Sequence, residues 1–257
     1  MKISIITVVL NHVSTIRSTI ESVLNQTHPD IEYIIIDGGS TDGSKEIIES
    51  YGSKVNRFIS EPDKGMYDAL NKGLGMTTGE IIGSLNADDI YTSDRILETV
   101  AEAFTHNDID TLFADVHFVR EPKLKKTVRY ISGKSFKPYK LRFGFMPPHP
   151  TLFVKKSLFE KYGHYKINYH IAADYELIIR FLYTNKASYL YLPLDMIRMS
   201  SGGRSTISLH SKYILNKEIV RACRENGIYT NLPILFLKYF IKVFELFNFP
   251  DKKGQPI

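Results

Sequence analysis

Two adjacent acids, Asp88 and Asp89, follow a short apolar stretch in the first half of the chain. Residues 81–85 read Ile-Ile-Gly-Ser-Leu, which is typical of a buried strand. Core packing does not explain two carboxylates at the end of such a strand, although a single Asp there could stabilise a turn. Carboxylates suit a hard divalent cation that carries phosphate oxygens, and open α/β sheets bind ligands where their strands end. We therefore predict a metal and nucleotide site at Asp88 and Asp89.

Two further acids stand where a regular element meets a loop. Asp37 ends a β-branched run and precedes a Gly-rich turn at residues 38–44, in which Ser40 or Asp42 could cap the next helix. This turn has neither the spacing of a Walker loop nor the G-x-G-x-x-G of a dinucleotide-binding fold. Asp174 begins a strong helical pattern. There it is either a first-turn acid favoured by the helix dipole or a general base.

The first 120 residues alternate between strand and helix patterns. Apolar and β-branched runs predict strands at residues 2–9, 32–36, 58–60, 81–85 and 111–119. Apolar residues at helical spacing predict helices at residues 15–25, 45–51, 66–74 and 93–104. This alternation indicates an α/β fold with an open, mostly parallel sheet, right-handed crossovers and helices on both faces.

The pattern changes after about residue 120. Residues 123–142 contain eight Lys or Arg and no acid, and we predict a loop or irregular excursion there. A strand is predicted at 151–154, helices at 156–162, 174–183 and 210–226, and a flexible loop at 201–206. We divide the chain into a nucleotide-binding half (1–120), an acceptor-binding and catalytic half (121–207) and a C-terminal helical segment (208–257).

Composition narrows the compartment and the partners. The single cysteine, Cys223, excludes an internal disulfide and fits a reducing cytoplasm. The net charge of +5 favours an anionic partner, either a phospholipid surface or a diphosphate, unless it marks only a solvated face. No nucleic-acid-binding motif accompanies it, so we expect no nucleic acid. The apolar segment 232–249 carries Lys238, Lys242 and Glu245 on one helical face. It predicts either a helix lying on a membrane or one packed against the domain or a partner chain.

Several segments together resemble the family 2 glycosyltransferases with the GT-A fold, in particular bacterial enzymes of surface-polysaccharide assembly. The similarity is dense over residues 1–120, where it rests on residues 5–11, 36–43, 60–65, 68–73, 78–80 and 85–89. It continues more thinly through residues 149–163 and 173–180. The order of these segments and their places at strand ends make the resemblance specific.

The resemblance implies a nucleotide-sugar donor, usually UDP-linked, bound at the carboxyl edge of the sheet. The nucleotide contacts that it implies are Thr7, Val9, Asp37, Asp63 and Lys64. The Asp-x-Asp motif of the family falls on Asn86, Ala87 and Asp88, which implies Mn²⁺ or Mg²⁺ held by Asp88 and the adjacent Asp89. Asp174 matches the base that deprotonates the acceptor hydroxyl.

Two departures from the family pattern concern this site. Asn86 replaces the first acid of Asp-x-Asp, so metal binding rests on Asp88 with Asp89. Gly38 follows Asp37 where many relatives have a second acid. A third metal ligand could come from His149, His170 or His210.

The function predicted from these features is inverting, metal-dependent transfer of a hexosyl or N-acetylhexosaminyl group to a glycan or a lipid-diphosphate-linked acceptor. The pathway is surface-polysaccharide biosynthesis (O-antigen, capsule or exopolysaccharide), in the cytoplasm or on the inner face of the plasma membrane. A sugar nucleotidyltransferase is a weaker alternative, because residues 10–14 are not a Gly-rich basic loop. A non-catalytic nucleotide-sugar-binding or scaffold protein is the other alternative, which Asn86 keeps open.

Overall fold

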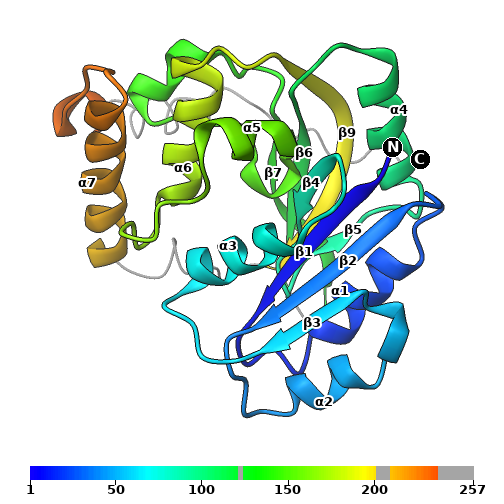
Figure 1. The fold of residues 1–257 in the computed structure, drawn as a ribbon. Coiled ribbons are helices and arrows are strands. Elements are labelled where there is room, and N and C mark those ends of the chain that lie inside the picture. Colours follow the sequence, from blue (N-terminus) through cyan, green and yellow to red (C-terminus); the bar gives the residue numbers. More distant parts are fainter. Residues whose placement is uncertain (121–123, 201–208, 237–257) are drawn as a thin grey trace.

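The computed structural model describes residues 1–120, 124–200 and 209–236 of the chain. These residues form one nine-stranded sheet in the order β3-β2-β1-β4-β8-β6-β9-β5, with β7 beside β6 (Figure 1). The strands are β1 (Ile3–Val9), β2 (Ile31–Asp37), β3 (Arg57–Ser60), β4 (Ile81–Ser84), β5 (Ile90–Tyr91), β6 (Thr111–Arg120), β7 (Leu124–Ile131), β8 (Phe153–Lys155) and β9 (Tyr189–Ser200).

Helices cover both faces of the sheet, as the strand and helix alternation predicts. The α-helices are α1 (Ile16–Leu24), α2 (Ser44–Glu49), α3 (Met66–Met76), α4 (Ile96–His106), α5 (Lys156–Tyr162), α6 (Ala173–Ile178) and α7 (Leu209–Glu225). Short 3₁₀ turns are η1 (Gly52–Lys54), η2 (Pro138–Phe143) and η3 (His149–Thr151), and η4 (Ile179–Thr184) is π-helical. One apolar core joins α1, α2 and α4 to one face of the sheet, and a second joins α3, α5, α6 and α7 to the other (Figure 1).

The four strands of the first half are parallel, as predicted. β1 lies between β2 and β4, and β3 adds to the outer side of β2. The register pairs Val9 with Asp37 and Asp37 with Ser60, so these three strands end at the same edge. The run of isoleucines in β2 is fully buried because both faces of the sheet are covered. This edge therefore collects the residues that follow each strand.

The second half of the chain continues the same sheet. β8 lies antiparallel between β4 and β6, β9 runs parallel to β6, and β5 and β7 are antiparallel edge additions. The irregular loop predicted at 123–142 is wrong for most of its length, because residues 124–131 form β7 and η2 follows it. β7 pairs on one side only, and such a strand needs few apolar residues. β9 was not predicted either, because most of its residues are only partly buried and show no clean alternation.

The helix predicted at 174–183 is present but changes character midway. α6 ends at Ile178, and the chain continues as the π-helical turn η4. A buried ion-pair network fixes this region. The Glu176 carboxylate is fully buried and lies 2.9 Å from both Arg180 and Lys166. Arg180 also donates to the carbonyls of residues 162–164, which ties the segment before α6 to the helix itself.

Glu225 extends this network from α7 and makes it sensitive to acid. Burial acts to raise the pKa of Glu225, but hydrogen bonds from Lys166 and Arg221 outweigh it and lower the pKa to about 2. Because the carboxyl has a lower pKa in the folded than in the unfolded protein, its stabilising effect is complete above about pH 4.5 and fades as the pH falls toward 2.

We therefore expect Glu225→Gln to lower the free energy of unfolding by about 2 kcal/mol at pH 7, allowing for partial solvent screening. The difference from the parent protein should shrink steadily between pH 4.5 and 3. Urea unfolding at several pH values measures it. A difference that stays constant over this range would contradict the role given to Glu225.

Two glycines of α3 give a matched test of how tightly this helix packs on the sheet. A Cβ at Gly73 would lie 2.6 Å from Cγ2 of Ile6, whereas one at Gly75 would meet nothing within 4 Å. We expect Gly75→Ala to raise the free energy of unfolding by about 0.5–1 kcal/mol, because alanine loses less backbone entropy. Gly73→Ala should lower it by about 1–3 kcal/mol, because the methyl group overpacks β1. Chemical unfolding of both variants gives the comparison, and equal effects would refute it.

Candidate active site

The carboxyl edge of β1 and β2 is built by a network of polar side chains. The carboxylate of Asp37 is fully buried. It accepts hydrogen bonds from Ser60 Oγ at 2.7 Å, from the Ser40 amide at 3.0 Å and from the Ser40 hydroxyl. Thr7 lies inside the sheet, where its hydroxyl pairs with that of Tyr33 at 3.1 Å. The side chains of Asp37 and Thr7 thus make their hydrogen bonds within the protein. Val9 is the last residue of β1 before the edge.

Two loops interlock above this edge. The Asn11 amide donates to Ser40 Oγ at 2.8 Å, and its side-chain oxygen accepts from the Thr41 amide at 2.9 Å. Asn11 adopts a left-handed conformation with φ 57°, which Asn tolerates better than most residues. A Cβ at Gly38 would collide with the carboxylate of Asp63. A larger residue at position 38 would therefore require the Asp63 side chain to move.

Asp63 and Lys64 stand at the start of α3, beside these loops. The Asp63 carboxylate accepts from the Gly65 amide at 2.7 Å, and the Lys64 amide donates to Asp68 at 3.0 Å. Gly65 has φ 114°, a conformation that favours glycine. The Lys64 side chain is exposed. The turn thus presents a cation next to the end of β2.

The two acids after β4 have different environments. Asp88 is partly exposed, whereas Asp89 is only 1% exposed. Asn86 Nδ2 donates to one oxygen of Asp89 at 2.9 Å, and the other oxygen has no partner in the described part of the protein. Burial, together with the charge of Asp88, raises the pKa of Asp89 to about 8. The turn therefore carries its accessible negative charge on Asp88.

The main chain of this turn is held from two other elements. Thr19 Oγ1 of α1 donates to the Asp89 carbonyl at 2.9 Å, and Ser200 Oγ at the end of β9 donates to the Asp88 carbonyl at 3.1 Å. β9 thus brings the second half of the chain to this turn, residues 86–89, which we call the acid turn. The predicted loop at 201–206 follows directly and lies outside the described residues.

Asp174 lies in the first turn of α6, and its side chain is 18% exposed. Its Oδ1 accepts from the Tyr175 amide at 2.7 Å and faces the Tyr67 hydroxyl at 3.5 Å. Its Oδ2 lies 3.4 Å from Nδ1 of His149. The Tyr67 hydroxyl also donates to the Ile171 carbonyl at 2.6 Å. Burial and the Asp174 charge raise the pKa of Tyr67, so it remains a donor. Asp174 is thus joined to α3 and to η3.

The residues at the acid turn fit a divalent cation that a diphosphate helps to hold. Asp88 offers an accessible carboxylate, and the unpartnered buried oxygen of Asp89 lies behind it. Across the described ranges, no group of three or more His, Cys, Asp or Glu side chains is placed to bind a metal. One or two carboxylates completed by phosphate oxygens and water are a common Mg²⁺ arrangement. None of the three candidate histidines completes such a group in the described structure.

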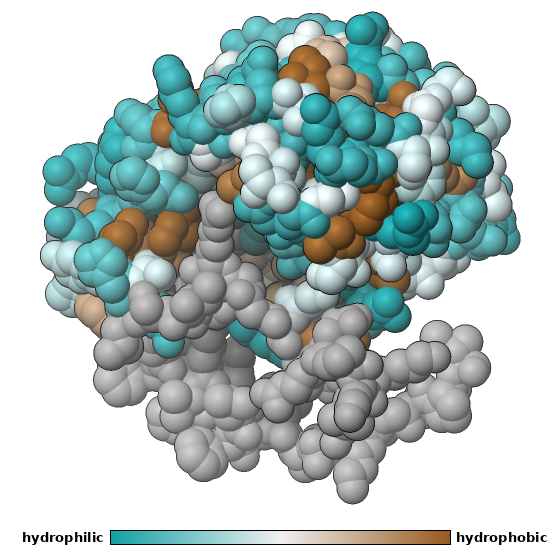
Figure 2. Space-filling view, turned by 90° about the horizontal axis from the view of Figure 1, so that it is seen from below, coloured by the Kyte–Doolittle hydropathy of each residue, from teal (hydrophilic) through white to brown (hydrophobic). Residues whose placement is uncertain are grey.

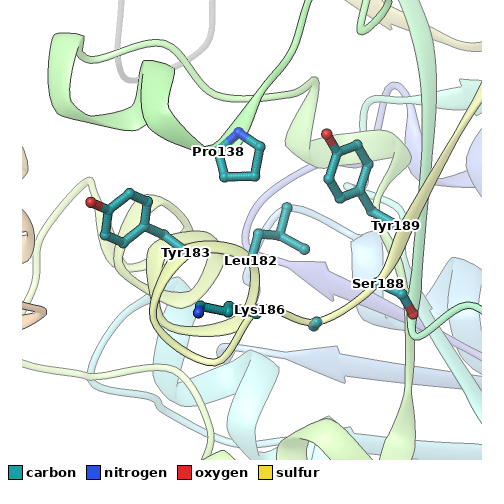
Figure 3. Close-up of a pocket in the computed structure, with 7 residues that line it drawn as sticks. Pro138, Leu182, Tyr183, Lys186, Ser188 and Tyr189 are labelled. Atoms are coloured by element: carbon teal, nitrogen blue, oxygen red, sulfur yellow. The ribbon is translucent and has the colours of Figure 1, made fainter.

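A wide, open cavity of about 650 Å³ lies elsewhere, near the amino end of β9 (Figure 3). It is lined by Pro138, Leu182, Tyr183, Lys186, Ala187, Ser188 and Tyr189. β9 starts there, level with the first residues of β6, so the cavity is at the opposite edge of the sheet from the acids. It contains no carboxylate and takes no part in the candidate site.

The family model described as "Glycosyl transferase family 2" matches residues 4–163. The chain belongs to glycosyl transferase family 2. A "PGL/p-HBAD biosynthesis glycosyltransferase" of Mycobacterium bovis is 29% identical over 181 residues, which cover 69% of this chain and 68% of that protein. An uncharacterised glycosyltransferase of Nostoc sp. is 37% identical over 113 residues, covering 42% of this chain and 34% of its own.

Solved structures confirm the GT-A type of fold for this family 2 glycosyltransferase. Residues 1–349 of S. aureus TarS in complex with UDP-GlcNAc superpose with a TM-score of 0.68 at 17% identity, covering 89% of this chain and 68% of that one. The mannosyltransferase PcManGT of Pyrobaculum calidifontis, in complex with GDP-Man and Mn²⁺, superposes with a TM-score of 0.60 at 15% identity. The match covers 96% of this chain and 81% of that one. The chain spans 41% of a longer TarS chain.

One residue of this glycosyltransferase that the sequence did not identify is Glu218, which hydrogen-bonds to the segment before α6. Ala172, at the start of α6, has no side chain that can cap the helix. Instead Glu218 of α7 accepts hydrogen bonds from the amides of residues 170, 171 and 172 at 2.7–2.9 Å. Glu218 is 8% exposed. An acid at a buried helical position was the signal available, but its partners lie more than 45 residues away.

We expect Glu218→Gln to lower the free energy of unfolding by about 1–3 kcal/mol, because the amide group leaves at least one backbone N–H unpaired. The kcat for sugar transfer should fall while the KM for the donor changes little, because residues 170–172 lead directly into the first turn of α6, which carries Asp174. Glu160→Gln, on the exposed face of α5, is the control of the same type. Steady-state kinetics and urea unfolding test both variants, and equal behaviour would refute the role.

Proposed function

We propose that the protein is an inverting glycosyltransferase that moves a sugar from a UDP-sugar to an acceptor hydroxyl, with a divalent cation on the diphosphate. The observation that carries this proposal is the arrangement around α3. This helix begins at Met66, two residues after Lys64 at the carboxyl edge, and its Tyr67 reaches both Ile171 and Asp174 of the second half. One rigid element thus connects the expected donor site with an acid suited to deprotonate an acceptor.

In the proposed reaction Asp174 is the base. Its Oδ1 is engaged by the protein, so Oδ2 takes the proton of the acceptor hydroxyl. The acceptor oxygen forms a bond to the anomeric carbon, and the bond from that carbon to the diphosphate oxygen breaks, with its electron pair leaving on the diphosphate. A single in-line displacement of this kind inverts the anomeric centre. When bound, Mn²⁺ or Mg²⁺ would stabilise the charge that develops on the leaving diphosphate, with Asp88 as its protein ligand.

The donor contacts of the proposal follow the carboxyl edge. We assign the nucleotide to the space between the loop after Val9 and the turn with Asp63 and Lys64, on the floor built by Asp37. Thr7 would support this site only indirectly, because its side chain lies within the sheet and hydrogen-bonds to Tyr33. Asn86 and Ala87 would shape the acid turn beside Asp88. The UDP of the TarS complex favours a UDP-linked hexose or N-acetylhexosamine, and the GDP-Man of PcManGT makes GDP-sugars the comparison.

The proposal is tested by measuring release of the nucleoside diphosphate from a panel of UDP- and GDP-sugars, with Mn²⁺, with Mg²⁺ and with a chelator. Release from a UDP-sugar that requires the metal and is lost in Asp174→Asn is the expected result. Turnover of only a GDP-sugar would overturn the donor assignment. Undiminished turnover in chelator would overturn the metal assignment.

A non-catalytic nucleotide-sugar-binding protein is the second candidate, and Asn86 is the observation that favours it. Asn86 occupies the first acid of the family motif and is engaged with Asp89 rather than open. Such a protein would bind UDP in calorimetry yet release none from any donor. An Asn86→Asp variant that gains turnover over an inactive parent would support this candidate.

The acceptor and the location are proposed from chemistry and from relatives. The mycobacterial relatives are named for PGL/p-HBAD biosynthesis, and we propose a glycan or lipid-diphosphate-linked acceptor of surface-polysaccharide assembly at the cytoplasmic face of the membrane. No helix in the described part is long and apolar enough to cross a bilayer. Seen from below, the described surface is mainly hydrophilic with small separate apolar patches (Figure 2).

We also propose that residues 232–249 contact the membrane, a segment of which only 232–236 are described. Phe236 and the nearby Tyr229 are 51% and 71% exposed, which suits an interface. Co-sedimentation with anionic vesicles is expected for the parent protein and should weaken in the double variant Lys238→Glu, Lys242→Glu. Equal sedimentation of the two would refute a contact made through these lysines.

A further inference from the structure

His149 stands between the two parts of the proposed site. It begins η3, and prolines 147, 148 and 150 surround it in sequence, which restrict the backbone of this turn. Its ring lines a narrow cavity together with Gly83 and Ser84 at the end of β4 and with Tyr165 before α6. His149 therefore lies next to the strand that leads to the acid turn and also next to Asp174.

The two oxygens of Asp174 differ in a way that gives His149 a role. Oδ1 has a protein donor at 2.7 Å in the Tyr175 amide. Oδ2, the oxygen that remains for a proton, has Nδ1 of His149 as its neighbour at 3.4 Å. This distance is longer than an ordinary N–H···O hydrogen bond, and such contacts commonly tighten when substrates bind. The His149 side chain is 44% exposed and the Asp174 side chain is 18% exposed, so the pair lies at the protein surface.

We propose that His149 is a positioning residue for the base: its Nδ1 donates to Oδ2 of Asp174 and fixes the direction of the remaining lone pair toward the acceptor hydroxyl. This inference rests on the proposed function of Asp174. A carboxylate with one oxygen held by the backbone can still rotate or tilt about its bond to the main chain. A second donor on the reactive oxygen removes that freedom, and misplacement of a base by about 1 Å can cost 100-fold in rate.

Two substitutions separate this role from a general structural one. An Asn side chain places its amide nitrogen close to where Nδ1 of the imidazole lies, whereas a Gln side chain places it near Nε2. His149→Asn should therefore retain a donor to Asp174, and His149→Gln should not. We expect kcat in the Gln variant to fall about 10- to 100-fold with the donor KM unchanged, as for other groups that orient a reactive residue. The Asn variant should stay within about 3-fold of the parent.

A double-mutant cycle completes the experiment. Release of UDP from the UDP-sugar of the panel that turns over is measured for the parent, Asp174→Asn, His149→Gln and the double variant. If His149 acts through Asp174, His149→Gln has no further effect in the Asp174→Asn background. An undiminished further loss there, or equal kcat values for His149→Asn and His149→Gln, would overturn the inference. Lack of turnover in the parent, or full turnover in Asp174→Asn, would instead overturn the proposed function.

Discussion

Asp174→Asn is expected to lower kcat for sugar transfer by about 10²- to 10⁴-fold, the range that a general base contributes. The substituted amide keeps an oxygen for the Tyr175 amide and the Tyr67 hydroxyl, so the start of α6 should remain in place. It cannot take a proton from the acceptor. The binding of UDP should stay unchanged, because the proposed nucleotide contacts lie on β1, β2 and the start of α3.

Asp108→Asn is the matched control, because Asp108 is fully exposed just before β6. Its kcat should equal that of the parent. Calorimetry with UDP and rapid-quench or steady-state assays with a UDP-sugar separate binding from turnover. A variant at Asp174 that loses UDP binding as well as turnover would indicate a collapsed site rather than a missing base.

The strands that form the carboxyl edge of the candidate site could be predicted from the sequence, because the pattern that identifies a strand is local. A β-branched run such as that of β2 is typical of a strand covered on both faces, and the residue after such a run must lie at an edge of the sheet. Asp37 is the last residue of β2, as predicted, whereas Asp88 and Asp89 lie in the turn after β4, four and five residues beyond its last residue, Ser84. Their accessibility could not be predicted. Asp89 turns inward because the turn after β4 closes with a bond from its own amide to the Asn86 carbonyl.

The position of Asp174 depends on contacts that no local sequence pattern encodes. Asp174 meets Tyr67 across 107 positions of sequence, and the amides just before α6 meet Glu218 across more than 45. Tyr67 has the spacing of an ordinary core residue of α3, so its second role becomes visible only once the helix is placed against α6. β9 is a second example. A partly exposed strand has only a weak alternation of apolar and polar residues, yet Ser200 of β9 hydrogen-bonds to the acid turn.

The second large effect is expected at the acid turn. Asp88→Asn removes the one accessible carboxylate there, because Asp89 is buried and bonded to Asn86. If a divalent cation neutralises the diphosphate as proposed, its loss costs several kcal/mol of stabilisation of the leaving group, which is about 10²- to 10³-fold in kcat/KM. Asp30→Asn, at the opposite edge of the sheet just before β2, is the control.

A readout that does not depend on turnover decides whether Asp88 acts through the cation. UDP binding to the parent should strengthen when Mn²⁺ or Mg²⁺ is added, because the cation links Asp88 to the diphosphate, and this gain should vanish in Asp88→Asn. Binding in the presence of a chelator should then be equal for the two proteins, or slightly tighter for the variant, since a repelling charge has been removed. A gain from metal that survives in Asp88→Asn would assign the cation to other ligands and leave Asp88 a role in the turn alone.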